Sequence, residues 1–243
     1  ANKYPGDLDI QTLYGEALMD LHPWNYWKKN GDPQPWTPEI VEVFENVIEK
    51  DPDHPGANHL YIHAVEASQR PERALPSARV LEEEVPGAGH LVHMPSHIYI
   101  RTGDYHRGTL ANERAVQADN AYVTQCRQQG IYPLAYVPHN YHFLWATATM
   151  EGRAERSIKA ARNTSELVDT SIMRQPGMGT LQHYRVIPLY AYVRFGKWGK
   201  ILDYPTPAED LIYPLGVWHY ARGLALTAGG KLPEAREALR DLE

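Results

Sequence analysis

A repeat of about 34 residues is the feature that most constrains what this chain can fold into. The segment 103–120 (GDYHRGTLANERAVQADN) has the layout of the segment 69–86 (QRPERALPSARVLEEEVP): a turn, a helix start, small or apolar residues at helical spacing, and a terminator. The two segments begin 34 residues apart, and related segments recur at 37–52, 151–168, 194–203 and 229–242. Such a unit is a helix pair that buries its apolar face by stacking on its neighbours. The sequence therefore predicts an all-α chain.

Small residues and glycines recur at matching places in these units. Alanines stand at the helix-contact positions and glycines at the turns between helices: Ala74, Ala78, Ala115, Ala161 and Ala235, and Gly103, Gly152 and Gly196. In these features nearly the whole chain resembles the tetratricopeptide (TPR) repeat family. The resemblance implies an α-solenoid of about six helix pairs with a concave groove, in a single TPR-like domain over residues 1–243. The segments 54–68 and 86–105 also resemble a narrower group of bacterial TPR-like proteins, which implies no particular activity.

Two aromatic-rich insertions interrupt the repeat, at 22–36 and at 119–137. One interpretation is that they pack over an edge of the solenoid, and the other is that they form a lid over its groove. The first residues of the chain read like the end of one helix running into another. We therefore expect the chain to be a fragment of a longer protein.

Composition excludes several classes of function. The net charge is −6, and a nucleic-acid-binding protein needs a basic face instead. The sequence contains no run of about 18 apolar residues, so no membrane span is predicted. The single cysteine, Cys126, excludes an intrachain disulfide and a cysteine-based zinc site. A soluble protein is expected, and both the cytoplasm and the periplasm stay open as its location.

Histidines carry the strongest functional signal. Two segments each contain His-x-x-x-His, with His59 and His63 in one and His93 and His97 in the other. Residues four apart lie on one face of a helix, so both imidazoles of a pair can reach one metal ion. The second pair follows the first by 34 residues, which is the repeat length. If the two helices are neighbours, the four rings can converge between them.

The TPR resemblance implies that these four histidines line the concave groove. It places Glu66 and His142 on the same face as candidate further ligands. Imidazoles with a carboxylate suit a divalent transition metal such as Zn, Cu, Ni or Fe. His90 is a candidate to support the ligands, and Asn58 and Asn140 are candidates to orient the imidazoles. The predicted function is binding of a divalent transition metal or small ligand in the groove.

Three alternatives stay open at this point. The histidines can be structural, each with its own hydrogen bonds, in a scaffold that binds a protein or peptide without metal. They can instead donate hydrogen bonds to a peptide in the groove. The chain can also be a metal-dependent enzyme of unknown substrate, with Glu66 as the general base. The zinc-protease motif HExxH is absent, because Leu60 and Met94 stand where its glutamate is required. Pro95 is expected near the first turn of a helix, which places His93 before that helix.

Overall fold

The computed structural model describes residues 1, 3–126 and 132–243, and over these residues the chain is all-α, as predicted. The only extended pairing among the described residues is an isolated bridge between Trp27 and Pro33. None of the described helices is long and apolar enough to cross a membrane. The helices form two compact units, residues 1–127 and 128–243, which are described separately.

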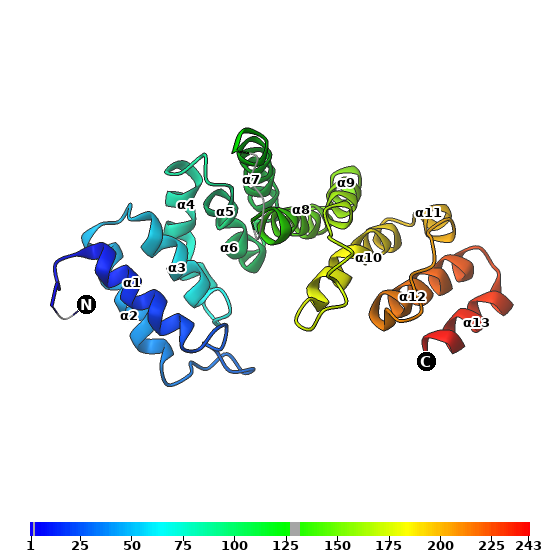
Figure 1. Ribbon diagram of the computed structural model, residues 1–243, viewed down its shortest axis with the longest axis horizontal. Coiled ribbons are helices and arrows are strands. Elements are labelled where there is room, and N and C mark those ends of the chain that lie inside the picture. Colours follow the sequence, from blue (N-terminus) through cyan, green and yellow to red (C-terminus); the bar gives the residue numbers. More distant parts are fainter. Residues whose placement is uncertain (2, 127–131) are drawn as a thin grey trace. The chain divides into compact units, whose positions relative to one another are not determined.

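The first unit is a series of helices in which each packs on the next (Figure 1). In chain order it contains α1 (Leu8–Asp20), α2 (Thr37–Lys50), α3 (Pro55–Val65), the 3-10 helix η1 (Pro71–Ala74), α4 (Leu75–Glu83), α5 (Gly89–His93), α6 (Pro95–Thr102) and α7 (Tyr105–Cys126). Contacts link α3 to α4 and α6, and α7 packs against both α5 and α6. These contacts bring α3, α5 and α6 together in space.

Local sequence explains where the helices of the first unit begin and end. The Asp7 carboxylate caps α1 by accepting from the Ile10 amide at 3.0 Å. Proline lies in the first turn of α2, α3 and α6, where its missing amide hydrogen costs nothing. Gly103 ends α6 with a φ of 84°, a left-handed conformation that glycine adopts without strain.

A continuous apolar core joins α1, α2, α3, α4 and α6. The apolar stripe of α2, with Ile40 and Phe44 fully buried, packs against α1 and α3 and belongs to this core. Ile62, Leu81 and Tyr99 lie in the same core. The amphipathic spacing that predicted these helices also predicts which of their faces lies in this core.

The second unit repeats the pattern of consecutive packed helices. It contains the short π-helix η2 (Tyr132–Tyr136), α8 (Val137–Met150), α9 (Ala154–Glu166), α10 (Gly179–Arg194), α11 (Trp198–Leu202), α12 (Ile212–Ala228) and α13 (Leu232–Leu242). Its main packed pairs are α8 with α9, α9 with α10, α10 with α12, and α12 with α13 (Figure 1). The single solenoid with one concave groove stays a prediction, as does the single-domain boundary.

The two insertions differ from each other. The first follows α1 as a loop, and the Trp27 indole donates to the Ala64 carbonyl on α3 at 2.7 Å, so it packs over the helix that carries His63. The second was predicted to begin at Asp119, but α7 continues through that buried residue to Cys126. Residues 127–131 of that insertion lie outside the described residues.

Candidate metal centre

Five of the histidines in the first unit form one contiguous cluster. His59 and His63 stand one turn apart on α3, with ring centroids 5.0 Å apart. The His90 ring lies 5.0 Å from that of His59, and the His97 ring 5.1 Å from that of His63. His93 closes the chain of contacts, 4.7 Å from His97 and 5.9 Å from His90. The repeat-matched pairs are therefore brought together as predicted, with His90 added.

Helix geometry explains how α5 and α6 position their histidines. His93 is the last residue of α5, and α6 begins at Pro95, as predicted from the proline. Met94 between them keeps helical angles, with φ −51° and ψ −37°. His93 and His97 therefore still lie one above the other across the junction, and both are buried.

Glu66 connects the two histidine pairs. Its Oε1 lies 3.0 Å from His63 Nδ1, and its Oε2 lies 2.5 Å from His97 Nδ1. Burial alone would raise the pKa of the Glu66 carboxyl, but His97 and His63 beside it hold that pKa well below its usual range. The ionised carboxylate can only accept, so each Nδ1 carries the hydrogen. That arrangement leaves each Nε2 as the atom able to bind a metal.

Asn112 on α7 fixes the ring of His93 in the same way. Its amide nitrogen donates to the Gly108 carbonyl at 2.8 Å, so its Oδ1 is the atom that lies 2.7 Å from His93 Nδ1. The Ser96 hydroxyl also donates to this Oδ1, at 3.3 Å. His93 Nδ1 must therefore be the donor toward Asn112. The amide predicted for this kind of role, Asn58, instead donates to the carbonyls of Pro52 and His54.

A conflict between lone pairs follows from these two anchors. His93 Nε2 and His97 Nε2 lie 2.8 Å apart in the buried interior. Since Asn112 and Glu66 hold the hydrogens on the two Nδ1 atoms, the Nε2 lone pairs of the two neutral rings point at each other. A cation between the two Nε2 atoms would make this contact favourable. Two nitrogens bound to a tetrahedral Zn²⁺ lie roughly 3.3 Å apart, so the rings need to separate by only about 0.5 Å.

Burial keeps His59 and His90 in the neutral form. Burial lowers the pKa of His59 from 6.5 to about 3, with further lowering by His63 and His97. Burial likewise lowers the pKa of His90 to about 3, helped by His59 and His63. Neutral imidazole is the form that binds a metal. The buried Nε2 of His59 has no hydrogen-bond partner among the described residues.

The described part of the first unit contains two sets of three residues that could hold a metal ion. Within each set, one ligand atom of every residue lies within 4.8 Å of the other two. One set is His59, His63 and His90, and the other is His63, Glu66 and His97. Histidine clusters in this unit are thus close enough to hold a metal ion. His90, expected only in a supporting place, belongs to the first set, and Asn112 was not recognised from the sequence. The one signal for His90 was its closeness in sequence to His93.

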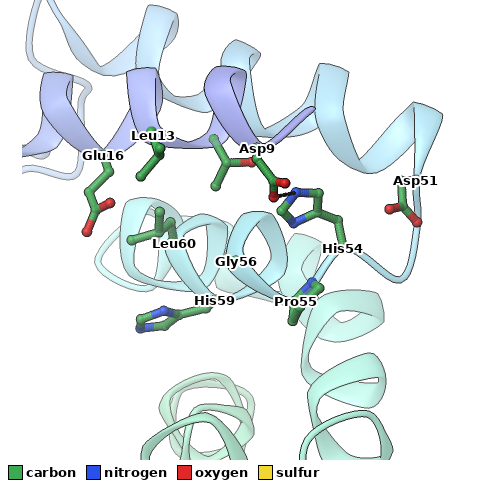
Figure 2. Close-up of a pocket in the computed structure, with 10 residues that line it drawn as sticks. Asp9, Leu13, Glu16, Asp51, His54, Pro55, Gly56, His59 and Leu60 are labelled. Carbon is green, nitrogen blue, oxygen red and sulfur yellow. Dashed lines mark ion pairs between the residues drawn. The ribbon is translucent and has the colours of Figure 1, made fainter. Parts of the chain in front are cut away.

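Two features border the cluster. The exposed Trp24 has a φ of 60°, which is strained for a tryptophan, and its ring is nearly perpendicular to that of His63, with ring centroids 5.3 Å apart. A pocket of about 560 Å³ between α1 and α3 has His59 in its lining (Figure 2). Asp9, Glu16 and Asp51 also line it, and carboxylates in a pocket raise the local concentration of cations.

His142, the remaining predicted ligand, lies in the second unit on α8. Its Nε2 is 3.4 Å from His183 Nε2 on α10. Burial lowers the pKa of His142 to about 4, with a smaller contribution from the neighbouring His183. His183 Nδ1 lies 2.8 Å from the Tyr213 hydroxyl. When that hydroxyl donates to His183 and His183 donates to His142, both of these contacts have one donor and one acceptor with neutral rings. This pair differs from His93 and His97 because it needs no cation.

Comparison with known proteins gives no family for this chain. No protein-family model matches it, and no curated protein sequence matches it either. The resemblance to TPR proteins therefore stays an expectation, and the arguments on function depend on the geometry of the histidine cluster alone.

Proposed function

We propose that the histidine cluster of the first unit binds a divalent transition metal, such as Zn²⁺, Cu²⁺ or Ni²⁺, through the Nε2 atoms of its imidazoles. The observation that carries this proposal is the 2.8 Å approach of His93 Nε2 to His97 Nε2. Hydrogen-bonded acceptors on the opposite side of each ring direct both lone pairs at the same point. Such partners of the second ring nitrogen are typical of metal-binding histidines.

Structural histidine is the competing explanation, and the buried geometry argues against it. A structural pair is stable when each of its contacts joins one donor and one acceptor, as the two contacts of His183 with Tyr213 and His142 can. In the first unit, the Nε2 lone pairs of His93 and His97 point at each other, and a metal ion between them turns this contact into two metal–nitrogen bonds.

The test is calorimetric titration of Zn²⁺ into the full chain, purified without a His tag and stripped with a chelator. We expect saturable binding of Zn²⁺ to the chelator-treated protein. His97→Ala should weaken binding strongly, whereas His106→Ala, at an exposed position, should bind as the wild type does. Wild-type protein that takes up no Zn²⁺, Cu²⁺ or Ni²⁺ would rule out the proposal. Binding of a protein or peptide, expected from the TPR resemblance, is a separate prediction.

A further inference from the structure

The nitrogens of the cluster do not all reach one point. The set of three that includes His59 and His63 is completed by His90. Among the described residues, no set of three within 4.8 Å combines His93 with His63 or with His59. Two imidazoles on one ion have their nitrogens within about 4.2 Å of each other, because each metal–nitrogen bond is about 2.1 Å. The described residues therefore offer no three-ligand site that joins His93 to His59 or to His63.

The second group has its own ligand atoms. His63 Nδ1 faces Glu66 at 3.0 Å, which leaves its Nε2 as the ligand atom. His59 brings a buried Nε2 that lacks a hydrogen-bond partner among the described residues. The His90 ring is 5.0 Å from the ring of His59 and 6.2 Å from that of His63. Three neutral imidazoles with an open fourth position are the ligand set of many zinc sites.

Glu66 contacts one histidine from each of the two groups, with a different carboxylate oxygen for each. One oxygen accepts from His63, and the other accepts from His97. Its charge partly offsets the charge of a cation on either side, and its two hydrogen bonds fix one ligand of each. Carboxylates that hold metal-binding histidines in this way are common features of metal sites.

From this arrangement we infer that the cluster is a two-metal centre. One divalent transition-metal ion lies between His93 and His97, and a second is bound by His59, His63 and His90. Glu66 is a positioning residue that orients one imidazole of each ion. This inference depends on the proposed metal binding and adds to it the number of ions and the division of the ligands.

The experiment measures metal content per chain by elemental analysis after loading the full chain with Zn²⁺ and removing unbound ions. We expect two ions in the wild type. The double variant His59→Ala/His90→Ala should keep one ion, and so should His93→Ala/His97→Ala. The matched control, His142→Ala/His183→Ala in the second unit, should keep two. Circular dichroism checks that each variant is folded.

A second measurement on the unaltered protein covers variants that fail to fold. Two Cu²⁺ ions in one cluster are magnetically coupled, so the electron paramagnetic resonance spectrum of the fully loaded wild type should show dipolar broadening and a half-field signal. A single uncoupled Cu²⁺ spectrum at saturation would overturn the two-metal centre and leave metal binding intact. A wild type that binds one Zn²⁺ per chain, lost in either double variant of the first unit, would likewise overturn the two-metal centre and leave metal binding intact. Loss of the second ion in the His142→Ala/His183→Ala variant would overturn the two-metal centre as well. Absence of any bound ion would overturn the proposed function as well.

Discussion

At the scale of single residues, the chemistry of the centre is set by groups that are not themselves histidines. An imidazole offers either nitrogen as a donor, so its sequence position does not reveal which nitrogen is available to a metal. Glu66 and Asn112 make that choice for His63, His97 and His93 by accepting from each Nδ1. The sequence proposed Glu66 as a ligand or base, and that stays a prediction, since Glu66 lies with His63 and His97 in a set close enough to hold a metal ion. Its two contacts add a role in orienting the rings.

Replacing Glu66 with glutamine tests this role. Glutamine has the same shape but a single carbonyl acceptor, so it cannot hold both Nδ1–H groups. We expect Zn²⁺ affinity to fall by about 10- to 100-fold without loss of the fold. Titration calorimetry gives the affinity, and Glu16→Gln is the control because Glu16 lines the neighbouring pocket of Figure 2. An unchanged affinity in Glu66→Gln would show that the carboxylate has no part in binding.

At the scale of helices, the centre depends on how closely α5 approaches α7. Gly89 opens α5, and a Cβ added to it would lie 1.9 Å from Asp119 Oδ1 and 3.0 Å from the Ala115 carbonyl oxygen on α7. Any side chain at this position therefore forces the two helices apart. Since His90 and His93 belong to α5, and Asn112 to α7, that separation also disturbs the centre.

Gly89→Ala tests this close approach. Overpacking of this kind costs about 1–3 kcal/mol, so we expect a lower free energy of unfolding in urea together with weaker Zn²⁺ binding. Gly87→Ala is the matched control, two residues earlier, where an added Cβ meets nothing within 4 Å. If both variants unfold at the same urea concentration, a side chain at position 89 does not force α5 and α7 apart.

At the scale of the whole molecule, burying a group of imidazoles makes the metal-free protein sensitive to acid. The folded chain keeps His59 and His90 neutral, with pKa values of about 3, whereas in the unfolded chain they titrate near 6.5. Between these values the unfolded chain binds protons that the folded chain does not. The free energy of unfolding must therefore decrease as the pH falls below 6.5.

The predicted pH dependence is measurable by thermal unfolding of chelator-treated protein between pH 7.5 and 5. Each of the two histidines should contribute a decrease of at most about 1.4 kcal/mol per pH unit below pH 6.5. The variant His90→Gln should show a shallower dependence, and His106→Gln, at an exposed position, should keep the wild-type slope. Unfolding temperatures that rise on acidification would contradict the neutral, buried state of these rings.

The sequence by itself determined the helices and the pairing of the histidines. Helical periodicity and the prolines at helix starts are local properties, so α2, α3 and α6 could be placed without a structure. The 34-residue offset predicted that His59 and His63 lie close to His93 and His97, because equivalent positions of a repeat lie on neighbouring helices. The ring distances agree with that prediction.

Only the tertiary structure decided how those rings act. His90 is on a five-residue helix whose place depends on the fit of Gly89 against α7, and no local pattern encodes that fit. Asn112 meets His93 across 19 residues of sequence, and hydrogen-bond direction at such a contact depends on three-dimensional geometry. The sequence therefore supplied the histidines, and the packing of helices against one another determined which nitrogen His63, His93 and His97 present to the interior of the cluster.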